Sequence, residues 1–187
     1  MSDGGGKTYR PWEPERYRQD AQSPAAKLPE GDVVFFLLDT VPQLELRRFY
    51  APYEPETRGA PPYDPAMMVC LLLYAYCVGV LSSRKIALAC ERNLAFVAIV
   101  GPDRPDFRTI SDCRKLHLEA FKDVFVKVVR LAAETGLVQL GNVSTDGTKI
   151  QGHASRHKAM SSGAMQKAVE RLREALATLV TAAYQQD

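Results

Sequence analysis

A strongly apolar segment runs from Met67 to Leu81, with apolar residues on nearly every side of the helix that it would form. Asp64 is a good N-cap and Pro65 a good first helical residue, so the pattern predicts a helix over 66–81 that is buried on most faces. The segment is shorter than the roughly 18–20 apolar residues that span a bilayer. We therefore expect a core helix and no membrane partner.

Shorter segments on either side predict further helices. The apolar run 33–38 leads into the amphipathic residues 43–50, and Asp39 or Thr40 can cap a helix that begins there. After the central helix, a serine pair at 82–83 can cap a helix over 84–91. An apolar segment at 94–100 then precedes a loop rich in Gly, Pro and Asp.

The last long amphipathic pattern of this helical part begins near Thr109. Thr109 and Asp112 have the spacing of a capping box, which predicts a helix from there to about residue 134. Gly136 supplies the stop signal. Much closer to the end of the chain, the apolar stripe over 163–184 predicts one more amphipathic helix.

Beyond Gly136 the apolar period changes from that of a helix to that of a strand. Leu137–Val143 and Thr148–Gln151 have the pattern of two strands, joined at Asp146-Gly147, a dipeptide frequent in hairpin turns. The predicted fold class is therefore mainly α: a helical, helix-turn-helix-like region, then a β-hairpin and a C-terminal helix. We divide the chain into a flexible leader (1–36), a helical domain (37–136) and a third part (137–187).

The composition of the chain is not that of a polycation. Of its 187 residues 46% are hydrophobic and 25% charged, with a formal net charge of +2. Any surface for nucleic acid must therefore come from local clustering of cations. Between Ser82 and His117 there are seven Lys or Arg and four acids. The N-terminus has no apolar signal-peptide core, and the four cysteines form no C-x-x-C pair, so we expect free thiols in a reducing compartment.

The basic residues of this cluster lie near predicted helix starts, as in a helix-turn-helix protein that holds phosphates around the helix in the major groove. The candidate DNA-binding residues are Arg84, Lys85, Arg108, Thr109, Ser111, Arg114 and Lys115, with Lys149, Arg156 and Lys158 as secondary contacts. The alternative from periodicity alone is a plain helical bundle whose surface charges keep it in solution.

Asp146 is the candidate for chemistry. A carboxylate at the end of a strand, followed by a basic segment, suits metal-dependent phosphoryl transfer, although a two-metal site needs several acidic ligands. An Asp before Gly is also a common turn residue. His153 and His157 have i, i+4 spacing but no Glu or Cys nearby to complete a metal site.

Four sequence segments, in order, resemble the N-terminal portion of bacterial insertion-sequence transposases of the InsH type. The segments are Tyr53–Pro65, Gly79–Ala87, Pro105–Ser111 and Ser144–Lys149, and the resemblance extends over about Leu37 to Lys158. It implies that the helical part binds the terminal inverted repeats of the element as double-stranded DNA. It also implies assembly with further transposase copies.

The same resemblance implies a DDE-class catalytic domain with an RNase H-like fold. Asp146 matches the first carboxylate of the triad, which would coordinate Mg²⁺, whereas the second Asp and the Glu are expected downstream of Asp187. We therefore expect an incomplete catalytic domain and no strand cleavage by this chain alone, in a bacterial cytoplasm and near the nucleoid. A regulator that inhibits full-length transposase, or a remnant of a decayed element, are the alternatives.

Overall fold

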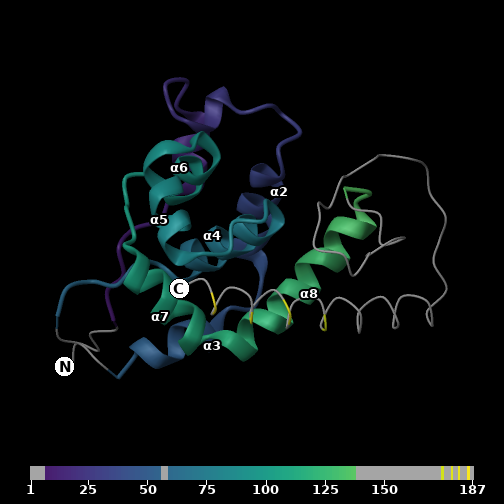
Figure 1. Ribbon diagram of the computed structural model, residues 1–187. Coiled ribbons are helices and arrows are strands. Elements are labelled where there is room, and N and C mark those ends of the chain that lie inside the picture. Colours follow the sequence, from purple (N-terminus) through teal and green to yellow (C-terminus); the bar gives the residue numbers. More distant parts are fainter. Residues whose placement is uncertain are drawn as a thin grey trace, which may run out of the picture.

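The computed structural model describes residues 7–55 and 59–137, together with four isolated helical positions near the end of the chain, Glu174, Thr178, Thr181 and Gln185. In this part of the chain every regular element is a helix or a 3-10 turn (Figure 1). The elements are α1 (Pro14–Gln19), η1 (Ala25–Lys27), α2 (Val33–Thr40), η2 (Val41–Gln43), α3 (Arg47–Tyr50), η3 (Ala51–Tyr53), α4 (Pro65–Cys77), α5 (Ser83–Arg92), α6 (Leu94–Val100), α7 (Phe107–Leu116) and α8 (Leu118–Glu134).

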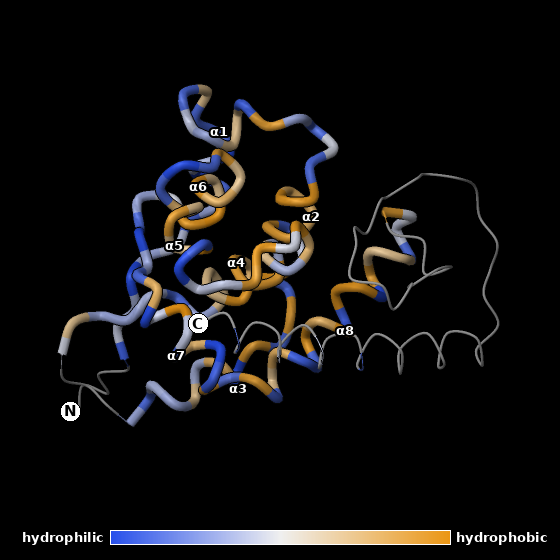
Figure 2. Tube along the Cα trace, viewed as in Figure 1, coloured by the Kyte–Doolittle hydropathy of each residue, from blue (hydrophilic) through white to orange (hydrophobic). Residues whose placement is uncertain are grey.

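Helix α4 is the centre of the core, as its apolar pattern predicts. Every residue from Pro65 to Tyr76 is buried, and Figure 2 shows that α2, α4 and α6 consist mostly of apolar residues. The Asp64 carboxylate accepts a hydrogen bond from the Ala66 amide at 2.8 Å, which confirms the predicted N-cap. The apolar side chains of this helix thus supply a large share of the burial that holds the helices together.

The end of α4 differs from the predicted one. The helix stops at Cys77, four residues before the apolar run does, because Gly79 adopts φ 75° and reverses the chain. The amides of Gly79 and Val80 donate to the carbonyls of Tyr76 (3.2 Å) and Ala75 (2.8 Å). These two bonds form a Schellman motif, so residues 78–82 are a turn between α4 and α5.

Helices α5 and α6 confirm the predicted elements and are joined by a single residue. Asn93 ends α5 and begins α6, and its side-chain oxygen accepts hydrogen bonds from the amides of Ala95 (3.0 Å) and Phe96 (3.4 Å). A one-residue connection allows little variation in the angle between the two helices. The direction of α5 is therefore fixed by the packing of α6, whose Phe96, Ile99 and Val100 are buried.

The helix predicted from Thr109 to residue 134 is two helices. Asp106, three residues before the predicted cap, accepts from the amides of Arg108 (2.8 Å) and Thr109 (3.0 Å), so α7 begins at Phe107 and the capping-box prediction is wrong. At His117 the backbone leaves the helical region (φ −110°, ψ 16°) and the chain turns into α8. At this break the His117 ring is buried against Phe49, with ring centroids 5.1 Å apart.

The helices of the N-terminal part also differ in detail from those that the sequence pattern predicts. The apolar run 33–38 is itself helical, in α2, with Asp32 as the cap, and residues 41–50 form two short elements instead of one helix. Within the stretch assigned to a leader, the Trp12 indole donates to the Ile99 carbonyl at 2.8 Å. The domain boundaries stay a prediction.

The predicted β-hairpin requires a correction. Residues 7–55 and 59–137 contain helices and no strand, so the described part of the chain is mainly α, and the β-hairpin expected to open an RNase H-like domain is not seen in it. Leu137, the expected first strand residue, instead closes α8: its amide donates to Ala132 at 2.9 Å, next to a Gly136 with φ 77°. The rest of the expected hairpin, to Gln151, lies outside the described residues. Among the described helices, none has the length and apolar content to cross a membrane.

Candidate nucleic-acid interface

Helices α5 and α7 bring two predicted DNA-binding residues together. The guanidinium carbon of Arg84 lies 4.8 Å from the centroid of the Phe107 ring, and that of Arg108 lies 5.7 Å from the same ring. Both arginines are exposed, whereas Phe107 is half-buried. One aromatic ring thus supports two cations from different helices, a geometry in which the ring face attracts guanidinium groups.

The outer face of α5 is basic with one apolar position. Its buried side consists of Ser83, Ile86 and Cys90, which pack on the core. The exposed residues of this helix are Arg84, Lys85, Leu88, Glu91 and Arg92. Their spacing of i, i+1, i+4, i+7 and i+8 places them on one face of the helix. Three cations against one acid make this face net positive.

The outer face of α7 is mixed in charge. Arg108 and Lys115 are exposed there, but so are Asp106 and Asp112. Hydrogen bonds from the Thr109 and Arg108 amides and from the Thr109 hydroxyl keep the pKa of Asp106 below its usual value, so this carboxylate is charged at neutral pH. The Thr109 hydroxyl is therefore engaged in the helix cap, and Ser111 is half-buried.

Arg114, predicted to contact DNA, is instead buried. It is only 2% exposed, and its guanidinium donates to the Leu81 carbonyl at 2.9 Å and to the Ser83 hydroxyl at 3.0 Å. These bonds connect α7 to the residues that begin α5. Arg114 accordingly positions the basic face and is not itself offered to a phosphate. Its sequence context, an Arg-Lys pair on a helix, does not distinguish it from the exposed Lys115.

Two residues of the basic face are not among the candidate contacts: Leu88, which the sequence prediction missed, and Arg92, which it counted only among the basic residues near helix starts. Arg92 and Leu88 complete the stripe that Arg84 begins, at spacings of four residues. A helical wheel over residues 83–92 was the signal that would have found them. Arg104, in the loop before α7, is exposed as well but donates to the carbonyls of Gly101 (2.6 Å) and Asp103 (2.5 Å).

The remaining predicted residues, Asp146, Lys149, Arg156 and Lys158, lie outside the described residues. Within the described part of the chain, no group of three or more His, Cys, Asp or Glu side chains is placed to hold a metal ion. Burial raises the pKa of the Cys90 and Cys113 thiols to about 12, so both are neutral at physiological pH. The Mg²⁺ site at Asp146 stays a prediction.

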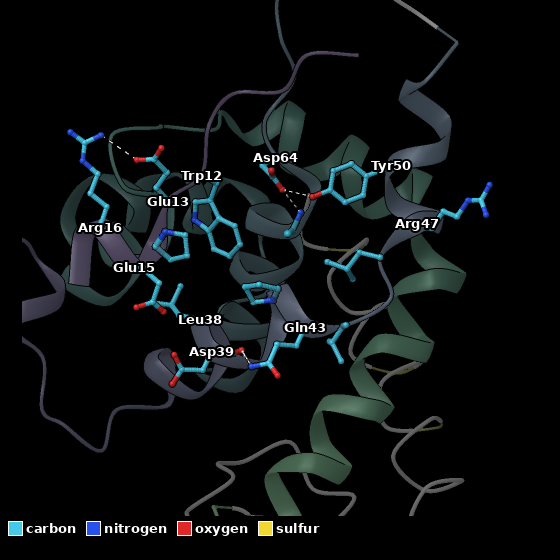
Figure 3. A pocket seen from close by; sticks show the side chains of 15 residues that line it. Trp12, Glu13, Glu15, Arg16, Leu38, Asp39, Gln43, Arg47, Tyr50 and Asp64 are labelled. Atoms are coloured by element: carbon cyan, nitrogen blue, oxygen red, sulfur yellow. Dashed lines mark hydrogen bonds and ion pairs between the residues drawn. The ribbon is translucent and has the colours of Figure 1, made fainter. Parts of the chain in front are cut away.

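A separate groove of about 910 Å³ lies between the N-terminal segment and helices α2–α4 (Figure 3). Its polar side chains pair with neighbouring groups: the Tyr50 hydroxyl donates to Asp64 at 2.7 Å, and the Gln43 amide to the Asp39 carbonyl at 2.7 Å. Burial and the Asp64 charge raise the pKa of Tyr50 well above its usual value. The Tyr50 bond ties α3 to the start of α4, and the Gln43 bond ties η2 to α2. The groove has no lining residue from α5 or α7.

The described part of the chain is thus helical, with a basic outer face on α5. Residues 22–116 match the family model described as Transposase domain (DUF772), about half of the chain. The chain therefore belongs to this transposase family, which confirms the resemblance in its sequence. The match takes in the helices α2 to α7. Neither the curated proteins nor the solved structures contain a match to the chain.

Proposed function

We propose that this transposase-family chain binds double-stranded DNA through α5, with α7 beside it, and that its target is the terminal inverted repeat of an insertion element. The observation that carries the proposal is the net positive outer face of α5, next to Arg108 on the shared Phe107 ring. Cations on the exposed face of a helix and on its neighbour suit phosphate contacts around a groove.

The connection before α5 supports a helix-turn-helix arrangement. Helix α4, the turn 78–82 with its left-handed Gly79, and α5 have the order of the two helices and the glycine-containing turn of that motif, with a turn of five residues where three or four are usual. In such a motif the first helix packs in the protein and the second lies in the major groove. The burial of α4 and the exposed face of α5 agree with these roles.

A salt titration tests the proposal. Binding of the full chain to a labelled inverted-repeat duplex is measured at increasing salt and compared with a scrambled duplex of equal length. The slope of log affinity against log salt should be smaller by about 0.9 for each phosphate that the protein no longer neutralises. The variant Arg84→Ala/Lys85→Ala/Arg108→Ala should therefore have a slope smaller by about 2.7 than that of the native chain.

The matched control removes the same charge from elsewhere. Lys27, Arg47 and Lys127 are exposed and lie outside α5 and α7, so Lys27→Ala/Arg47→Ala/Lys127→Ala alters net charge equally. We expect this variant to keep most of the slope. Equal reductions in both triple variants would mean that binding depends on net charge alone, and the assigned surface would be wrong.

A further inference from the structure

We infer that Leu88 reads DNA sequence by contact with the 5-methyl group of thymine in the major groove. The inference rests on the proposed function, because it takes α5 as the helix that enters the groove. It adds a residue of a different kind to the basic contacts: an apolar side chain that distinguishes one base from the others.

The first observation is the position of Leu88. Arg84, Leu88 and Arg92 follow one another at spacings of four residues, so they form one stripe along α5 with the leucine in the middle. Lys85 and Glu91 border this stripe, and all five residues are exposed. The middle of this exposed face is therefore apolar, with charged residues around it.

The second observation is the exposure of the side chain. Leu88 is 46% exposed, whereas the opposite side of α5 is buried at Ser83, Ile86 and Cys90. A single exposed leucine is ordinary on a protein surface. One at the centre of a net positive helix face has a specific use, since the cations draw the face toward phosphates and the leucine then meets the floor of the groove.

The dimensions of α5 suit this placement. The helix has ten residues, which corresponds to about 15 Å, and a helix with its side chains is about 10–12 Å wide, close to the major-groove width of about 12 Å. Helix α7 is less suitable, because Asp106 and Asp112 on its outer face would approach phosphates. The charges therefore favour α5 as the groove helix and α7 as a flanking element.

Thymine is the base that a leucine can select. In the major groove A, G and C present hydrogen-bonding groups at their edges, and only thymine adds a methyl group. An apolar contact with that methyl removes both groups from water. One buried methyl-sized group corresponds to a difference in affinity of about fourfold.

The experiment replaces thymine with deoxyuridine, which removes the methyl group and changes no charge. The full chain first enriches a binding sequence from a random-sequence duplex library, and each thymine of the enriched duplex is then replaced singly. For the native chain we expect affinity to fall about fourfold at one position or more. Leu88→Ala should bind the thymine and deoxyuridine duplexes equally, while it keeps the salt dependence of the native chain.

Leu137→Ala is the matched control, because Leu137 has the same 46% exposure but follows α8, away from α5 (Figure 1). It should retain the thymine preference, and circular dichroism should show that both variants are folded. A native chain insensitive to every deoxyuridine, or a Leu88→Ala variant that keeps the preference, would overturn the inference alone. Absence of salt-dependent binding to the library would overturn the proposed function too. An altered oligomeric state of Leu88→Ala with unchanged DNA binding would assign Leu88 to contact between copies, against the inference.

Discussion

The guanidinium of Arg114, in α7, donates a hydrogen bond to the main-chain carbonyl of Leu81 across 2.9 Å. Leu81 lies in the turn between α4 and α5, so this bond joins the start of one exposed helix to the inner side of the next. The same guanidinium reaches the Ser83 hydroxyl at 3.0 Å. The angle at which α5 presents its basic face thus depends on a residue that is itself buried.

Replacing Arg114 should therefore lower stability more than any other basic substitution on α7. Arg114→Met removes the hydrogen bonds to the Leu81 carbonyl and the Ser83 hydroxyl, at a cost of about 2–4 kcal/mol in the free energy of unfolding. Urea denaturation measures this free energy. Lys115→Met, one position along and exposed, should stay within about 0.5 kcal/mol of the native value. Similar values for both variants would contradict the role of Arg114.

The Phe107 ring should support DNA affinity without touching phosphate. Phe107→Leu removes the ring beneath Arg84 and Arg108, and an exposed cation–π contact is worth about 0.5–1 kcal/mol, or two- to fivefold in affinity. The slope of the salt titration should stay the same, because every cation is retained. Phe107→Tyr retains an aromatic face and should bind like the native chain.

The N-cap of α7 offers a direct comparison of two residues. Asp106→Ala should destabilise the protein by about 1 kcal/mol, whereas Thr109→Ala should cost less, because Asp106 accepts both main-chain bonds at this helix start. The pKa of Asp106 is lowered in the folded state, so its contribution is present above the unfolded carboxyl pKa and is lost as pH falls through the lower, folded pKa. Acid unfolding of Asp106→Ala should lack this component.

His117 should make stability depend on pH near neutrality. Burial lowers its pKa in the folded state, and its ring nitrogen Nε2 lies 3.3 Å from the Tyr53 hydroxyl. Below the ordinary histidine pKa of about 6.5 the unfolded chain takes up a proton that the folded chain does not, so stability falls as pH drops from about 7. Above that range this residue contributes no slope.

The variant His117→Gln separates this effect from other titrations. The difference in unfolding free energy between native and variant chains, followed by urea denaturation from pH 8 to pH 5, should change by at most about 1.4 kcal/mol per pH unit. His153 and His157 are present in both chains and cancel. A difference that is constant across this range would show that His117 titrates alike in both states.

Trp12 connects the N-terminal segment to α6 and is the single tryptophan of the sequence. Trp12→Phe removes the hydrogen bond to the Ile99 carbonyl and should lower the free energy of unfolding by about 1 kcal/mol or somewhat more. In the native chain, tryptophan fluorescence and circular dichroism should report the same urea midpoint. An earlier fluorescence transition would show that the N-terminal segment detaches first.

The helices of this domain could be predicted from sequence wherever a cap and an apolar pattern agree. Asp64 and Pro65 begin α4 as expected, and residues 94–100 form α6. The ends of the helices were harder to predict, because the apolar run 67–81 continues through the turn at Gly79. Likewise His117 interrupts a continuous amphipathic pattern, since its ring packs on Phe49 from a distant part of the chain. Such contacts have no local signal.

The candidate site shows the same limit. Arg84, Lys85, Arg108 and Lys115 are exposed as a surface site requires, but the neighbouring Arg114 is buried, and composition cannot tell these cases apart. The charge on each helix face follows from spacing, so Arg92 and Leu88 were within reach of sequence reasoning. The stacking of two arginines on Phe107 could not be predicted from sequence, because it depends on how α5 and α7 pack against each other.

Helix α5 is held at both ends, by Arg114 at its start and by the shared residue Asn93 at its end. The conformational entropy of ordering this helix is therefore lost when the chain folds, and none of it has to be lost again on meeting a ligand. Under the proposed function, a helix ordered in this way adjusts little to the outline of a groove. We therefore expect discrimination between sequences to depend partly on how readily each duplex bends or widens to fit the protein.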